Sequence, residues 1–160
     1  MDFQSLTDDD LEAMRQAPKI VGNPNAQWVL KGAHREKNFI LHDAFNAAEA
    51  YRIFLRVSVR RDDVFSVGLA RVWAADKVLI LTRYNGGYHP HRNVLERTKV
   101  PAVCHRHIAT QRYIQAGLDP DGYAEAISGY NSVESAFRCL CIDSGVASLD
   151  YQPFQPELEF

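Results

Sequence analysis

Four of the six histidines lie within 19 residues and form two His-x-His pairs, His89 with His91 and His105 with His107. In an extended segment, residues i and i+2 point to the same side, so each pair presents two imidazoles together. If the two segments are neighbours in a sheet, all four rings converge. Imidazole titrates near neutral pH, so we expect the chemistry of the chain to be concentrated here.

The histidine pairs are surrounded by side chains that suit a phosphate or a carboxylate. The candidate binding residues are Arg83, Tyr84, Asn85, Arg92, Asn93, Thr110, Arg112 and Tyr113. In one interpretation, one histidine removes the 2′-proton of a ribose, another protonates the leaving oxygen, and the arginines stabilise the developing negative charge. This chemistry on an RNA phosphodiester requires no cofactor and no metal ion.

A metal site is a second interpretation. Neutral imidazoles at this spacing bind Zn²⁺ or another transition metal, and the ligands of such a metal-dependent hydrolase are His89, His91, His105 and His107. Glu96 is the only acidic residue between Arg83 and Tyr113. The surrounding positive charge therefore opposes binding of a dication.

A structural role is the third interpretation of this stretch. Arg83, Tyr84 and Asn85 then form a hydrogen-bonded turn, and Thr110 caps the helix that follows. The other two histidines, His34 and His42, lie outside the cluster and are assigned no role.

Local patterns predict the elements that position these residues. Thr7 and Asp10 form a capping box for a short first helix. Residues 51–59 alternate apolar and polar side chains, which indicates a strand with one buried face. The strand-like segments 64–72 and 77–84 follow it after short turns, and these three strands form an antiparallel meander. Further strand-like segments lie at 27–33, 37–41 and 100–108. Two helices follow, one closed by Gly117 and one opened by Ser132.

The fold class is therefore α+β. We expect an antiparallel meander sheet of about four to six strands, with a short N-terminal helix and with C-terminal helices packed on one face. The expected organisation is a single domain, 1–160, with an N-terminal helix in 1–20, mainly β structure in 27–108, mainly helical structure in 109–145 and an extended tail in 146–160.

Composition is that of a globular chain, with 46% hydrophobic and 24% charged residues. No apolar stretch is long enough for a membrane helix, and no secretory signal opens the chain, so we expect a cytoplasmic protein without a membrane partner. The three cysteines, an odd number, fit reduced structural thiols.

The net charge of −2 hides a basic middle segment. Residues 50–112 contain 12 Lys and Arg against four Asp and Glu, whereas the rest of the chain is acidic. A local basic surface of this kind can attract phosphate. Arg52, Arg56 and Arg60 form a stripe on one strand that is either a solvated face or a nucleic-acid track, and Phe54 offers a stacking surface between two of them.

The residues of the histidine stretch resemble an uncharacterised bacterial family. Its signature reads RYNG at 83–86, H-x-H-x-N at 89–93 and H-x-H-x-A-T-x-R-Y at 105–113. Gln111 stands where the family pattern has Glu. More distantly, the chain is similar to TumE-like toxins of toxin–antitoxin pairs.

The resemblance implies a small ribonuclease-like toxin. Its site would consist of His89, His91, His105 and His107 with Arg83, Arg112 and Tyr113. Its partners would be RNA or another phosphate-bearing ligand and a small antitoxin that covers the basic face. A different class also fits the basic face: a noncatalytic binding or inhibitor protein of a phage or mobile element, which occupies the nucleic-acid site of a target protein.

Overall fold

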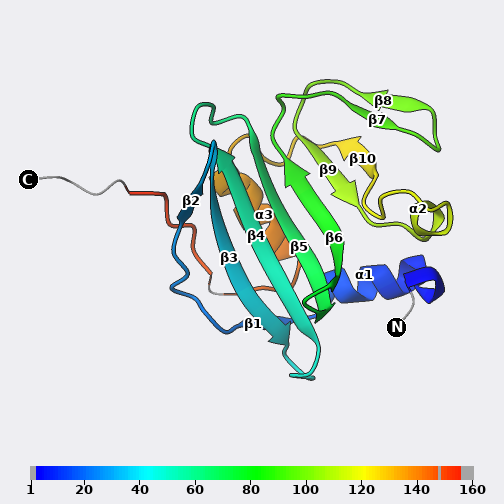
Figure 1. The fold of residues 1–160 in the computed structure, drawn as a ribbon, viewed down its shortest axis with the longest axis horizontal. Helices are drawn as coiled ribbons and strands as arrows, with labels where there is room; N and C mark the ends of the chain where they lie inside the picture. Colours follow the sequence, from blue (N-terminus) through cyan, green and yellow to red (C-terminus); the bar gives the residue numbers. More distant parts are fainter. Residues whose placement is uncertain (1–2, 148, 156–160) are drawn as a thin grey trace, which may run out of the picture.

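A computed structural model describes residues 3–147 and 149–155 (Figure 1). The helical elements are η1 (Phe3–Ser5), α1 (Asp8–Gln16), α2 (Gln111–Gln115) and α3 (Val133–Asp143). The strands are β1 (Lys19–Val21), β2 (Val29–Lys31), β3 (His34–Asp43), β4 (Ala50–Ser58), β5 (Phe65–Ala74), β6 (Lys77–Asn85), β7 (His91–Asn93), β8 (Thr98–Val100), β9 (His105–Ile108) and β10 (Tyr123–Ala126).

The main sheet is antiparallel and has the order β1-β3-β4-β5-β6-β9-β10, with β2 paired to the other end of β3. The α+β class, the meander and the capping box at Thr7 are confirmed. The expected four to six strands were too few, because the sheet has eight within residues 3–147 and 149–155. Strands of three or four residues, such as β1 and β10, are too short to show a clear alternation.

Two segments differ from the expected organisation. The expected strand 100–108 is divided between β8 and β9, with Pro101 just after β8. Proline has no N–H to donate to a ladder and often ends a strand. The segment 109–145, expected to be mainly helical, contains β10 between its two helices. Of the expected tail, residues 148 and 156–160 lie outside the described residues, and the rest has no helix or strand.

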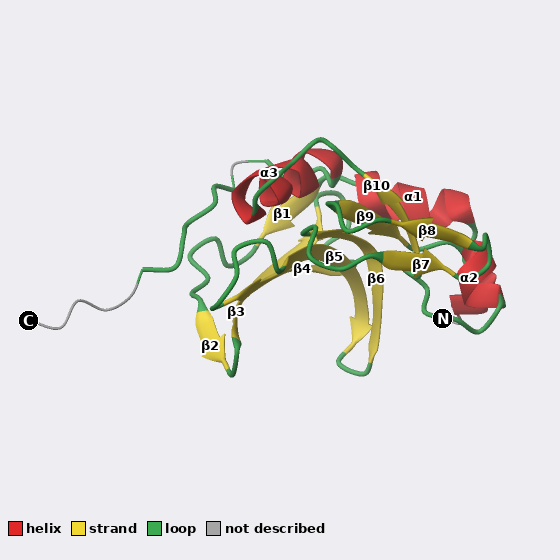
Figure 2. Ribbon diagram, turned by 90° about the horizontal axis from the view of Figure 1, so that it is seen from above, coloured by secondary structure: helices red, strands yellow, loops and turns green. Residues whose placement is uncertain are grey.

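The two faces of the sheet have different surroundings. Tyr51, Ile53 and Leu55 are at most 1% exposed and belong to the core that α1 and α3 cover. The expected burial of this face of 51–59 is confirmed as far as Leu55. The sheet is arched, with these helices on its convex side, and its concave side is left open (Figure 2). Side chains on this open face are therefore available to a ligand.

Lys19 joins the ends of the two long helices to the sheet edge. Its ammonium group donates to the carbonyl oxygens of Arg15, Ala17 and Ser144, at 2.7–3.0 Å. A cation is favoured at helix C-termini, where carbonyl groups lack partners. Burial lowers the pKa of Lys19 to about 8.

The three cysteines are free thiols. Burial raises the pKa of Cys141 to about 12 and also raises those of Cys104 and Cys139. The reactive thiolate form is disfavoured at all three positions. Among the described residues, no helix has both the length and the apolar character needed to cross a membrane.

The RYNG motif ends β6 at a close backbone approach. The N–H of Gly86 donates to the carbonyl of Phe65 at 3.0 Å. A Cβ atom at position 86 would stand 2.1 Å from the backbone oxygen of Asp63. Glycine is therefore required here for space, because neither backbone segment can yield without breaking the end of the sheet.

Substitution of this glycine is expected to destabilise the protein. Gly86→Ala should lower the free energy of unfolding by about 2 kcal/mol or more, since the methyl group overlaps backbone. The matched control is Gly129→Ala, where no atom lies closer than 3.8 Å to the added Cβ. It should change stability by no more than about 0.5 kcal/mol in urea denaturation. Equal effects of the two substitutions would contradict this account of the motif.

Candidate functional site

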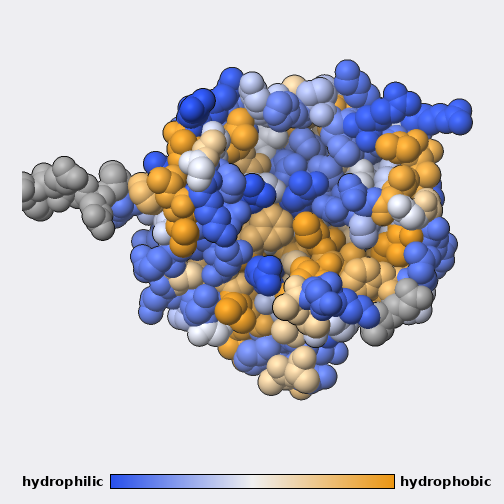
Figure 3. All heavy atoms as spheres, viewed as in Figure 1, coloured by the Kyte–Doolittle hydropathy of each residue, from blue (hydrophilic) through white to orange (hydrophobic). Residues whose placement is uncertain are grey.

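A cleft of about 700 Å³ lies on the open face of the sheet. Cross-strand pairing lines up its residues in two rows, because neighbours on adjacent antiparallel strands share a face. One row runs Arg56, Ser66, Asn85 and His105 across β4, β5, β6 and β9. The next row runs Phe54, Gly68, Arg83 and His107. Figure 3 shows this face with apolar side chains in its centre and hydrophilic side chains along the upper rim.

Three imidazoles meet at the β9 end of the cleft. His105 and His107 come from β9, and His91 from β7 lies beside them. Ring centroids are 4.5 Å apart for His91 and His107, 5.1 Å for His105 and His107, and 6.0 Å for His91 and His105. The expected convergence thus occurs for three of the four clustered histidines.

Each of the three rings has one nitrogen held by a backbone carbonyl. Nδ1 of His107 lies 2.8 Å from the oxygen of Asp121, and Nδ1 of His105 lies 2.9 Å from that of Val103. Nε2 of His91 lies 2.7 Å from the oxygen of Gly122. A carbonyl only accepts, so each of these nitrogens carries a hydrogen. In the neutral ring the other nitrogen keeps its lone pair: Nε2 of His105 and His107, and Nδ1 of His91.

Burial keeps two of the rings neutral. His105 and His107 are 4% and 3% exposed. Desolvation, with the nearby guanidinium of Arg83, lowers the pKa of His107 to about 3. Desolvation also lowers the pKa of His105. Both side chains therefore hold an available lone pair at neutral pH.

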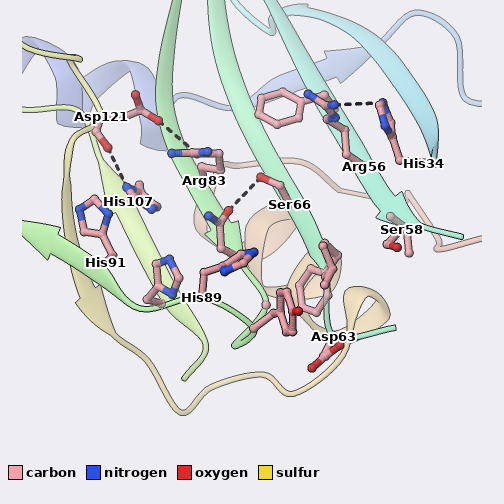
Figure 4. A pocket seen from close by; sticks show the side chains of 18 of the residues that line it. His34, Arg56, Ser58, Asp63, Ser66, Arg83, His89, His91, His107 and Asp121 are labelled. Carbon is pink, nitrogen blue, oxygen red and sulfur yellow. Dashed lines mark hydrogen bonds and ion pairs between the residues drawn. The ribbon is translucent and has the colours of Figure 1, made fainter. Parts of the chain in front are cut away.

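Arg83 lies directly opposite His107 on the adjacent strand β6. Its Nε lies 3.2 Å from Oδ2 of Asp121 (Figure 4). Although the two atoms are close enough for an ion pair, neither has a hydrogen-bond partner of normal geometry among the described residues. Burial raises the pKa of Asp121, and Arg83 opposes that rise. The guanidinium is thus oriented by Asp121 and keeps capacity for another anion.

Asn93 fixes the strand that carries His91. Its amide donates to the carbonyl of Ala124 and accepts from the N–H of the same residue, both at 2.8 Å. The side chain thereby pairs with the edge strand β10 as a backbone would. Asn93, expected to bind substrate and two residues from His91 in the chain, is 3% exposed, and its amide is occupied by the backbone of Ala124.

Other expected site residues lie away from the imidazoles. Arg112 and the hydroxyl of Tyr113 both contact the carboxylate of Glu96, which holds the β7–β8 arm to α2. Thr110 caps α2, as one interpretation of the sequence expected. Arg92 is exposed on β7 and does not line the cleft.

Tyr84 points to the opposite face of β6. Its hydroxyl contacts Asp143 of α3, and its ring is buried in the core. The neighbouring Arg83 and Asn85 face the cleft, because successive side chains of a strand alternate. His89 lies on the rim of the cleft, exposed, with its ring against Tyr88 at 4.3 Å.

Several residues of the cleft were missed by the sequence analysis. Asp121 and Gly122 belong to the turn before β10, which packs beside the histidines. Arg56 and His34 lie at the far end, with Arg56 Nη2 3.0 Å from His34 Nε2 (Figure 4). The only earlier signal was that Arg56 belonged to the basic stripe. Asp121, Gly122 and His34 reach the cleft through strand pairing between distant segments, which no local sequence spacing indicates.

No group of three or more metal-ligating side chains among the described residues has an arrangement that could hold a metal ion. Comparison of the chain with protein-family models, with curated proteins and with solved structures found no match. The resemblance to the bacterial family and to TumE-like toxins stays a prediction.

Acid is expected to destabilise the fold through His107. The unfolded imidazole binds a proton near pH 6.5, whereas the folded one does so only near pH 3. Stability should therefore fall as pH falls through this window, by at most about 1.4 kcal/mol per pH unit. In His107→Asn the side-chain amide can still donate to the carbonyl oxygen of Asp121. Urea denaturation between pH 7 and pH 4 should show a smaller loss of stability in this variant than in the wild type.

The matched control for this measurement is His89→Asn, because His89 is exposed at the cleft rim. It should keep the wild-type slope. Parallel pH profiles for the wild type and His107→Asn would contradict a buried neutral imidazole at this position.

Proposed function

We propose that the cleft binds a phosphodiester of RNA and cleaves it by acid–base chemistry of its histidines, without a metal ion. The observation that carries this proposal is the meeting of three imidazoles beside Arg83, two of them buried and neutral. Histidine serves as both base and acid near neutral pH. A guanidinium supplies the charge that a phosphate requires.

His105 and His91 suit the two proton-transfer roles. Their centroids form the most widely separated pair of the three, 6.0 Å apart, and their ring planes are nearly parallel. We place the phosphate at the edge of this pair of rings, where it would contact both. Nε2 of His105 takes the proton of the ribose 2′-hydroxyl as the 2′-oxygen attacks phosphorus. The bond from phosphorus to the 5′-oxygen breaks, and that oxygen takes a proton from the imidazolium of His91. The products are a 2′,3′-cyclic phosphate and a 5′-hydroxyl.

The third ring and Arg83 act on the phosphate. Arg83 balances the negative charge that accumulates on the nonbridging oxygens. His107 lies opposite Arg83 and packs against the rings of His91 and His105. A bound phosphate raises the pKa of adjacent imidazoles, so ligand binding itself shifts them toward the catalytic range.

The setting we propose is that of a toxin in a toxin–antitoxin pair, and it rests on the sequence resemblance alone. The partner would be a small antitoxin that covers the open face. Its acidic groups would meet the basic side chains there, of which Arg56 is exposed.

One observation favours a noncatalytic protein with the same cleft. An imidazole with a pKa of about 3, as at His107, is a weak base at neutral pH. In that case the cleft binds its nucleic-acid or nucleotide ligand and releases it unchanged.

Cleavage of a short single-stranded RNA separates the two functions. The wild type should release a 2′,3′-cyclic phosphate product in the presence of EDTA and leave the matching DNA, which lacks the 2′-hydroxyl, intact. His105→Gln and His91→Gln should each slow cleavage by about 10²- to 10⁴-fold, the usual contribution of one acid–base group. Gel analysis with mass spectrometry of the product ends measures both.

The matched control is His89→Gln, at the rim of the same cleft, which should retain the wild-type rate within a few-fold. RNA that stays intact with the wild type would remove the ribonuclease and leave the noncatalytic binder. Cleavage that survives both His105→Gln and His91→Gln would contradict the assigned roles.

A further inference from the structure

The cleft has a second half that the acid–base chemistry does not use. It is formed by Phe54 and Arg56 of β4, with His34 of β3 and Tyr88 before β7 on its border. Phe54 is half-buried on the open face, two strands away from Arg83 in the same cross-strand row. Two strand spacings correspond to about 10 Å, a span that one nucleotide bridges.

The ring of Phe54 lies on Gly68. A Cβ atom at position 68 would stand 2.2 Å from Cζ of Phe54 and 2.5 Å from Cε1. Glycine therefore makes the space in which the aromatic ring rests on the floor of the cleft. Among the described residues, no aromatic ring stacks on Phe54 and no cation lies over it. The ring thus has a surface free for a planar ligand.

The polar groups beside this ring are hydrogen-bond donors. Ser66 donates its hydroxyl hydrogen to Oδ1 of Asn85 at 2.9 Å, which leaves the Nδ2 hydrogens of Asn85 to donate. The exposed side chain of Arg56 borders the same space, and its guanidinium keeps donor hydrogens beyond those directed at Glu36 Oε1 (3.4 Å) and His34 Nε2 (3.0 Å). A planar ligand with carbonyl or ring-nitrogen acceptors at its edge, as in a nucleobase, matches these donors.

We infer that Phe54, seated on Gly68, forms a subsite that stacks a single unpaired nucleobase while Arg83 and the histidines hold the phosphate of the same nucleotide. This inference rests on the proposed function, since it places the base relative to that phosphate. A base stacked on a protein ring has left its own helix, so the substrate is single-stranded.

Binding of matched small ligands tests the subsite without any cleavage. Uridine 5′-monophosphate and ribose 5-phosphate differ in the base, and calorimetry measures their affinities for the full chain. Stacking of one base contributes enough to tighten binding by about 5- to 100-fold. We expect uridine 5′-monophosphate to bind the wild type more tightly than ribose 5-phosphate by a factor in this range.

Two substitutions locate the effect at the ring. Phe54→Leu keeps an apolar side chain but removes the π face, and it should reduce nucleotide affinity to nearly that of ribose 5-phosphate. Gly68→Ala keeps Phe54 but fills the place of its ring, so it should have a similar effect. Neither should change the affinity for ribose 5-phosphate by more than about two-fold. Circular dichroism and thermal unfolding verify that both variants fold.

The outcomes separate this inference from the cleavage proposal. Equal affinities of the wild type for the two ligands, or no measurable binding of the nucleotide, would overturn the subsite even if RNA is cleaved. Full nucleotide affinity in both Phe54→Leu and Gly68→Ala would overturn it as well. Base-dependent binding that is lost in these variants, together with intact RNA, would support the subsite and remove the ribonuclease.

Discussion

The candidate site depends on the register between β6 and β9. This pairing sets Arg83 opposite His107 and Asn85 opposite His105, and all four side chains face the cleft. Side chains of the core hold it: the hydroxyl of Thr82 donates to the carbonyl of His107, and the hydroxyl of Tyr130 contacts the carbonyls of Asn85 and His105. A shift by one residue would turn both imidazoles into the core and expose their neighbours.

The same burial that stabilises the sheet sets the protonation of the site. His105 and His107 are buried beside His91 of β7, and His107 also contacts the turn at Asp121. Neutral rings are the consequence, because a charged imidazole would lose its hydration. Backbone carbonyls then fix which nitrogen of each ring carries the hydrogen. The fold therefore prepares lone pairs toward the cleft before any ligand arrives.

Local sequence patterns were sufficient for the parts of the fold that local interactions determine. The alternation in 51–59, which the structure shows as far as Leu55, the capping box at Thr7 and the His-x-His spacing at 105–107 each concern neighbours in the chain. The two helices opened by Thr110 and Ser132 also begin where side-chain capping predicts. These signals act over a few residues and do not require knowledge of the tertiary fold.

Non-local packing determined what the sequence could not show. Asp121 reaches His107 and Arg83 only because β10 returns along β9. Tyr113 was grouped with the histidines by proximity in sequence, yet the capped helix α2 directs it to Glu96. The ring of Phe54 packs on Gly68 of the adjacent strand, and neither residue alone indicates this contact.

The protonation and tautomers of the clustered rings test the central claim most directly. Nitrogen-15 NMR of the histidine side chains at pH 7 and pH 5 reports both for each ring. The account predicts that His107 stays neutral at both pH values with its hydrogen on Nδ1, and that His105 at pH 7 has the same tautomer. A charged His107 at pH 5, or a hydrogen on Nε2 of either neutral ring, would contradict the claim that burial and backbone carbonyls set the protonation of these rings.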